Sequence, residues 1–193
     1  MSRTVRITAA VAAALALAGT AHAMEPAKGA AEQGKFETHT LQMPRSTAPL
    51  PYTIELPAGW QARPWLNDQW VLIAPPGEMP GEVGKPANPR AMIVRHSIVD
   101  IRDPEAVVAN MRANLAQDKQ LKVDVLEVRE VAGVKGIVSQ IESGDGDARR
   151  ITYGLKVPLG DKSIDFTVSC PTGAFSEYRP LYERIFSSLK KAS

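Results

Sequence analysis

Few residues in this chain form a pattern that could perform chemistry. The sequence has one cysteine, Cys170, and three histidines, of which only His39 and His96 lie beyond an apolar leader. A thiol paired with an imidazole base can act as a nucleophile, so Cys170 with His96 is one hypothesis. Both lie on apolar strand faces, His96 beside Met92, Val94 and Ile98, which favours a core histidine and a thiol that acts as a small hydrophobe. We predict no catalytic residue.

Metal and cofactor sites are equally poorly supported. Glu142, Asp145 and Asp147 could offer oxygens to calcium, but the calcium-loop spacing is absent, and a hairpin turn over Gly144 to Asp147 explains both aspartates. The glycines of residues 77–84 do not form a phosphate-binding pattern before a helix. We therefore predict neither a metal nor a cofactor.

The first 23 residues have the features of a signal peptide. Arg3 and Arg6 precede an apolar run from Ile7 to Ala18, and Ala21 and Ala23 fit the positions that a signal peptidase recognises. The run is too short for a mature membrane anchor, and no lipoprotein cysteine follows it. We expect cleavage after Ala23, export to a bacterial periplasm, and a flexible lead-in over residues 24–34.

Charge argues against one class of partner. The chain has 23 Lys and Arg residues against 21 Asp and Glu, and removal of Arg3 and Arg6 with the leader leaves 21 of each. Without a positive surplus or a long basic run, a nucleic-acid partner has little electrostatic support. About 170 mature residues are enough for one domain with its own core, which we place at residues 35–191.

Periodicity predicts mainly strands. We expect strands near residues 52–56, 70–74, 92–99, 121–128 with a bulge near Val125, 134–141, 150–157 and 163–170. Asp103 as an N-cap and Pro104 at the first helical position predict a helix over about 103–118. A second amphipathic helix is expected over about 174–190, regular from near Ser176 so that Pro180 falls in its first turn. Residues 75–89, with five prolines and three glycines, predict a long loop.

The polar face of the last hairpin is our candidate binding surface. Alternation predicts that its polar residues project away from the core as a ribbon of hydrogen-bonding groups. Trp65 joins this set because it lies between Pro64 and polar residues, whereas Trp60 and Trp70 are expected in the core. The candidate binding residues are Trp65, Arg150, Thr152, Lys156, Asp165, Thr167 and Ser169, together with the 75–89 loop.

These elements predict an α+β fold, an antiparallel sheet of six or seven strands with helices packed on it. The segment from Tyr52 to Trp60, the helix introduced by Asp103 and Pro104, the hairpin ending at Cys170 and the closing segment from Phe175 to Leu189 resemble the PsbP-like superfamily, which includes DcrB-like bacterial envelope proteins. The resemblance implies an α/β/α sandwich that acts as a non-enzymatic binding or assembly module.

The resulting functional hypothesis is an exported, assembly-assisting module that docks an envelope protein partner, has no membrane anchor, and is a monomer or a weak oligomer. The alternative is a small-ligand carrier or a minor hydrolase with a cleft near His96 and Cys170. An inert, inaccessible Cys170 would remove the only nucleophile of the alternative.

Overall fold

The computed structural model describes residues 34–43, 50–66, 68–78, 88–145 and 149–192. The predicted signal peptide, nearly all of the lead-in and most of the 75–89 loop lie outside these residues. Within them, no helix is long and apolar enough to cross a membrane.

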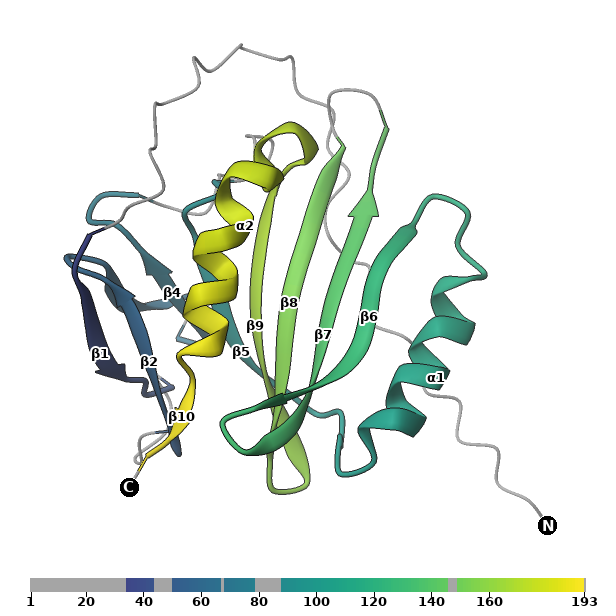
Figure 1. Cartoon of the computed structure of the whole chain (residues 1–193), viewed down its shortest axis with the longest axis horizontal. Helices are drawn as coiled ribbons and strands as arrows, with labels where there is room; N and C mark the ends of the chain where they lie inside the picture. The colour runs from purple at the N-terminus through teal and green to yellow at the C-terminus, as the bar shows by residue number, and fades with distance from the viewer. Residues whose placement is uncertain (1–33, 44–49, 67, 79–87, 146–148, 193) are drawn as a thin grey trace.

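Two antiparallel sheets and two helices make up the described chain (Figure 1). The large sheet has seven strands in the order β3 (Gln61–Trp65), β4 (Trp70–Ala74), β5 (Met92–Ser97), β9 (Lys162–Pro171), β8 (Arg150–Leu159), β7 (Val134–Ser143) and β6 (Lys122–Val131). The small sheet has β1 (Phe36–Thr40), β2 (Tyr52–Pro57) and β10 (Lys190–Lys191). The helices are α1 (Pro104–Leu115) and α2 (Thr172–Ser187). The predicted α+β fold is confirmed, and the second sheet adds to it.

The β8–β9 hairpin fixes the centre of the large sheet. Apolar and polar residues alternate strictly in both strands, so Ile164, Phe166 and Val168 are buried on one face. A turn at Gly160, where φ is +60°, brings Lys156 opposite Asp165 and Thr152 opposite Ser169. The predicted phase of both strands is confirmed.

Each face of the large sheet carries a helix. Helix α2 and the small sheet cover one face and bury the main core, where Tyr153 stacks on Phe186 at 5.4 Å between ring centroids. Helix α1 packs on the opposite face against β6 and β7, through Val108, Leu115 and their strand neighbours Leu126 and Ile137. This arrangement is the predicted α/β/α sandwich.

The helix boundaries correct one prediction. Helix α1 begins as expected, because the Asp103 carboxylate accepts a hydrogen bond from the Ala106 amide at 3.1 Å. Helix α2, by contrast, begins at Thr172, so Pro180 lies inside the helix and not in its first turn. Pro180 is exposed and only one amide donor is lost, while Phe175 and Tyr182 hold the helix on the sheet.

Both edges of the large sheet are blunted. Edge strand β6 has the predicted bulge, with a register shift between Val123 and Val125, and the Arg112 side chain of α1 donates to the Leu126 carbonyl at 2.5 Å. Figure 1 shows α1 beside this strand. The opposite edge strand, β3, is five residues long and contains Pro64.

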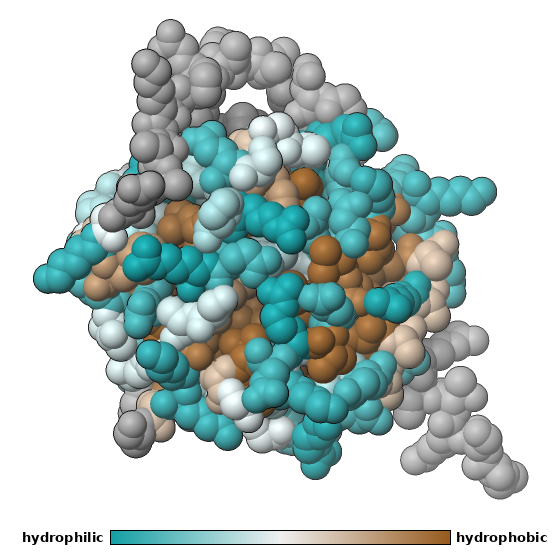
Figure 2. All heavy atoms as spheres, in the orientation of Figure 1, coloured by the Kyte–Doolittle hydropathy of each residue, from teal (hydrophilic) through white to brown (hydrophobic). Residues whose placement is uncertain are grey.

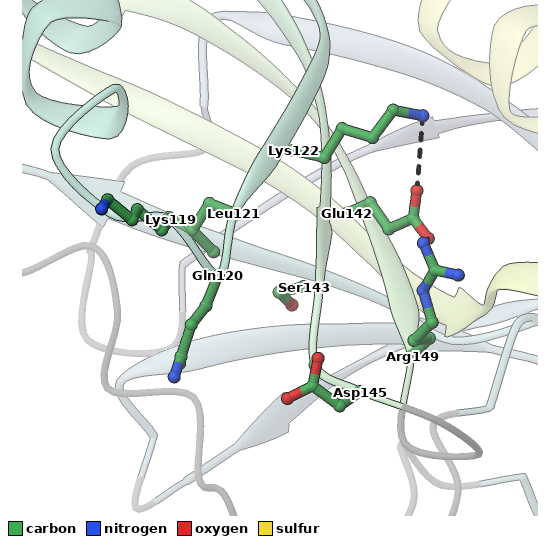
Figure 3. Close-up of a pocket in the computed structure, with 9 residues that line it drawn as sticks. Lys119, Gln120, Leu121, Lys122, Glu142, Ser143, Asp145 and Arg149 are labelled. Carbon is green, nitrogen blue, oxygen red and sulfur yellow. Dashed lines mark ion pairs between the residues drawn. The ribbon is translucent and has the colours of Figure 1, made fainter.

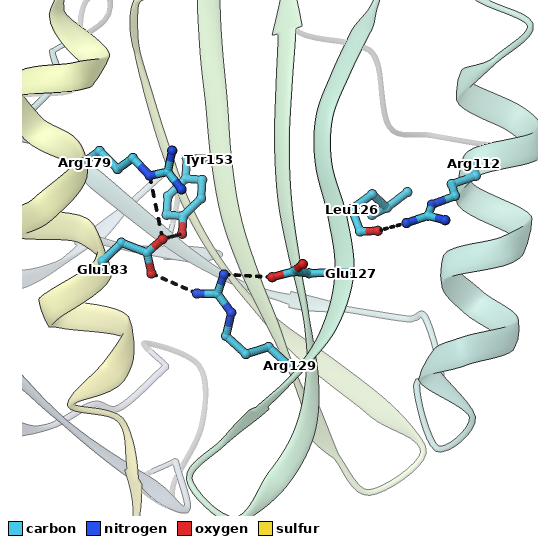
Figure 4. Close-up of polar contacts among 7 residues, drawn as sticks. All are labelled: Arg112, Leu126, Glu127, Arg129, Tyr153, Arg179 and Glu183. Carbon is cyan, nitrogen blue, oxygen red and sulfur yellow. Dashed lines mark hydrogen bonds and ion pairs between the residues drawn. The ribbon is translucent and has the colours of Figure 1, made fainter.

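A polar network joins α2 to the large sheet (Figure 4). The Tyr153 hydroxyl donates to Glu183 at 2.5 Å, and Arg129 of β6 pairs with the same carboxylate at 2.8 Å. Arg129 also reaches Glu127, and Arg179 lies 3.9 Å from Glu183. Figure 2, in the orientation of Figure 1, shows that hydrophilic side chains break up the apolar areas on this side of the molecule.

Candidate functional site

The face of the large sheet opposite α2 carries Trp65 and the hairpin residues of the predicted binding surface, whereas most of the predicted 75–89 loop lies outside the described residues. We call this face the open face and define it by Trp65, Trp70, Arg95, Arg150, Thr152, Lys156, Asp165, Thr167 and Ser169. Helix α1 covers only the β6–β7 end of this face. The residues of the open face thus come from β3, β4, β5, β9 and β8, while Leu72 and Ala74, on the Trp70 side of β4, are buried with Ala91.

A continuous row of contacts crosses these five strands. The rings of Trp65 and Trp70 are paired across β3 and β4, with centroids 5.8 Å apart. The Arg95 guanidinium lies 5.7 Å from the centroid of Trp70, and its Nε atom is 3.4 Å from Asp165 Oδ2. Asp165 in turn pairs with Lys156, whose Nζ also donates to Ser97 Oγ at 3.2 Å. Indole, guanidinium, carboxylate and ammonium groups thus form one connected surface.

The row is more buried than the sequence predicts. The side chains of Lys156 and Asp165 are only 15% and 12% exposed, so the prediction of a fully projecting polar ribbon is wrong for these two residues. Burial lowers the pKa of Lys156, while the adjacent carboxylate of Asp165 acts in the opposite direction. The two charges are thus compensated by each other more than by water.

The remaining hydrogen-bonding groups of the open face are accessible. Thr152, Thr167 and Ser169 are half-buried, and their hydroxyls have no hydrogen-bond partner within the described residues. We call the strip formed by Thr152, Thr167 and Ser169 the hydroxyl lane. Gly154, which lies between Ser139 and Thr167 in the cross-strand register, is itself buried. Arg150 is half-buried at the end of β8 and has no carboxylate partner in the described chain.

The predicted positions of the tryptophans need correction. Trp60 is buried, as expected. Trp65 is the last residue of β3 and not a loop residue, and Trp70 is half-buried on the open face and not in the core. Sequence reasoning missed Trp70 and Arg95. The alternation of β5 could have identified Arg95. This residue lies between Val94 and His96, so its side chain must face away from the side of Met92 and Val94.

His96 and Cys170 do not form a site. His96 pairs with Ile164 and is exposed, so the prediction of a core histidine is wrong. Cys170 lies six residues further along β9, about 20 Å away at the rise of an extended strand. It is fully buried, and burial raises the pKa of its thiol to about 12, as expected of an inert small hydrophobe. The two residues share no cleft.

The pocket drawn in Figure 3 lies at the end of β7 and is also polar. Its volume is about 320 Å³, and its lining comes from Lys119–Lys122, Glu142–Asp145 and Arg149. Glu142 pairs with Arg149 at 2.5 Å and with Lys122 at 3.6 Å, so its carboxylate is already neutralised. No group of three metal-binding side chains occurs among the described residues, and Asp147 lies outside them.

Comparison with solved structures identifies the architecture. The chain is similar to cyanobacterial PsbP (CyanoP) from Synechocystis sp. PCC 6803, with a TM-score of 0.54 and 14% identity over 85% of this chain and 96% of that one. The fold is PsbP-like. LpqN, involved in cell envelope biogenesis of Mycobacterium tuberculosis, has a TM-score of 0.51 and 9% identity over 82% and 92% of the two chains.

A third structure with this PsbP-like fold is PA94 from Pseudomonas aeruginosa, a protein of unknown function described as a putative regulator. Its TM-score is 0.50, with 12% identity over 83% of this chain and 99% of that one. No family model and no curated protein sequence matches the chain. At these identities the similarity establishes the fold, and the residues of the open face must carry any functional argument.

Proposed function

We propose that this protein is an exported, non-enzymatic module that binds an envelope protein partner through the open face. The observation that carries the proposal is the connected row from Trp65 to Lys156, which lies beside the hydroxyls of Thr152, Thr167 and Ser169. These hydroxyls have no hydrogen-bond partner in the part of the chain that the structure describes. Aromatic and arginine side chains at the centre of a surface, with hydrogen-bonding groups around them, are typical of protein interfaces.

Two features support the location and the absence of chemistry. Arg3, Arg6 and the Ala21–Ala23 segment support export, and LpqN, which has this fold, is described as involved in cell envelope biogenesis. The hydrolase hypothesis required His96 to act as a base for Cys170. The distance between the two residues and the burial of the thiol argue against this pairing. A binding role, by contrast, uses the aromatic, arginine and hydroxyl groups that lie on the open face.

The interface test places a photo-crosslinking amino acid at Thr152 on the open face or, as a control, at exposed Glu177 on α2. The proteins are expressed in a bacterium with an intact envelope and irradiated, and the adducts are identified by mass spectrometry. We expect one defined adduct from Thr152 that is lost in Arg150→Glu and retained in Arg179→Glu. Equal adducts from both positions would contradict a specific interface on the open face.

The export test is independent of the interface. N-terminal sequencing of the periplasmic protein should give a mature chain that begins at or near Met24. Retention of residues 1–23 on the exported protein would contradict the proposed location.

A further inference from the structure

The charges of the open face indicate what kind of partner it binds. The open face carries three basic residues, Arg95, Arg150 and Lys156, and one carboxylate, Asp165, which contacts Arg95 and Lys156. The binding residues therefore carry a surplus of positive charge, although the predicted mature chain as a whole is neutral. Electrostatic complementarity selects partners of opposite sign. We propose that the segment bound on the open face is an extended acidic stretch of polypeptide. This inference rests on the proposed binding function and adds the chemistry of the partner.

The Arg95 side chain is positioned to bind a carboxylate. Its guanidinium lies over Trp70 with Nε 3.4 Å from Asp165 Oδ2, and its side chain is 40% exposed. Its two terminal nitrogens donate no hydrogen bond to the residues that the structure describes. A guanidinium fixed by an aromatic ring loses little side-chain entropy when it binds a carboxylate in the bidentate manner. Arg95 provides the first anchor.

Arg150 provides the second anchor at a defined distance. Arg95 is in register with Asp165, and Arg150 is in register with Pro171, six residues further along β9. The two arginines are thus about 20 Å apart along the strand direction and about 10 Å across it. An extended peptide covers this span in six to seven residues, so we expect two acidic side chains with that spacing.

The hydroxyl lane between the anchors can form hydrogen bonds with an extended backbone. Thr167, Ser169 and Thr152 line it with hydroxyls that have no hydrogen-bond partner within the described residues. Gly154, next to Thr167 in the register, is buried, and a Cβ there would lie 3.2 Å from Ser139 Oγ. Hydroxyls donate and accept hydrogen bonds, so they can bind the polar groups of a peptide without demanding one sequence. The arginines then set the preference for acidic side chains.

The test uses a synthetic peptide of about 12 serine and threonine residues with two glutamates about six residues apart. Two further peptides carry glutamine or lysine in place of the glutamates. Binding to the mature protein is followed by tryptophan fluorescence and calorimetry. We expect saturable binding of the glutamate peptide, binding weaker by about tenfold or more for the glutamine peptide, and none for the lysine peptide.

Variants assign the effect to the anchors. Arg95→Gln and Arg150→Gln should each weaken binding of the glutamate peptide by about tenfold. Arg179→Gln on α2 is the matched control, because Arg179 is 48% exposed and also lies beside a carboxylate, Glu183. Circular dichroism and urea unfolding verify that each variant folds.

The outcomes separate the two proposals. Equal binding of the glutamate and glutamine peptides, no saturable binding of any peptide, or equal losses in Arg95→Gln and Arg179→Gln would overturn the acidic preference. If the Thr152 adduct still depends on Arg150, the binding function remains and only the acidic partner is wrong. If that adduct is absent too, both proposals fail.

Discussion

Lys156 and Asp165 face each other across β8 and β9 and form an ion pair that is largely buried on the open face. The aspartate is also 3.4 Å from Arg95, so one carboxylate connects the hairpin to β5. This pair decides which variants can probe the open face without unfolding the protein.

Lys156→Glu should destabilise the protein markedly. The change removes a charge-assisted contact and places two carboxylates opposite each other in a site with little solvent, whereas Lys156→Met should cost about 1–3 kcal/mol because Arg95 still faces Asp165. Urea unfolding measures both. Exposed Lys162→Glu is the control, expected within about 0.5 kcal/mol of wild type. A similarly small effect of Lys156→Glu would show that the pair contributes nothing to folding.

Phe166→Ala should cost about 3–5 kcal/mol, because the ring is fully buried on the core face of the central strand β9. Thr167→Ala, one residue away on the open face, should cost less than about 1 kcal/mol. Denaturant unfolding of the two variants compares the faces of one strand. A larger loss in Thr167→Ala would mean that the described phase of β9 is reversed.

Cys170 should resist thiol reagents in the folded protein at about pH 8, because burial raises the pKa of the thiol to about 12. The unfolded thiol ionises near its ordinary pKa, so this contribution to stability is complete below that pKa and falls as the pH rises towards about 12. Burial also raises the pKa of Tyr153 and Tyr182, which adds to the loss.

Urea unfolding at about pH 8 and about pH 10 measures that loss. Cys170→Ala should show a smaller decrease in stability between the two values, since the thiol then no longer contributes. Rapid labelling of native Cys170 at about pH 8 would be incompatible with its buried position.

Glu183→Gln should weaken the attachment of α2 to the sheet. Its carboxylate accepts from Tyr153 and pairs with Arg129, and an amide keeps the shape but loses both charge-assisted contacts, at a cost of about 1–3 kcal/mol. Glu177→Gln on the exposed side of α2 is the matched control in thermal unfolding. Equal melting temperatures would show that the network in Figure 4 contributes nothing measurable to stability.

The sequence was informative where alternation was strict. The β8–β9 hairpin, the bulge of β6 and the Asp103 cap could be predicted because each depends on neighbouring residues. Strands β1, β3 and β10 could not, because they are short, half-exposed or interrupted by Pro64, and their partners fix them. Arg184 over the ring of Phe36 at 3.5 Å is one such long-range contact.

The candidate site, too, could be predicted from the sequence only in part. Alternation predicted on which side of the sheet Lys156, Asp165 and Thr167 lie, but the covering of each residue depends on strands far away in sequence. Asp165 is buried because Arg95 and Lys156 flank it, and His96 is exposed although Met92 and Val94 on the same side are buried. Periodicity indicates direction, and tertiary packing decides exposure.

The edge strands of the large sheet bear on how easily the protein aggregates. A sheet whose outer strands present free amides and carbonyls can recruit strands from other molecules and grow into fibrils. Here a bulge and the Arg112 contact interrupt β6, and Pro64 removes a donor from β3. The two outer strands of the large sheet thus resist self-templated aggregation.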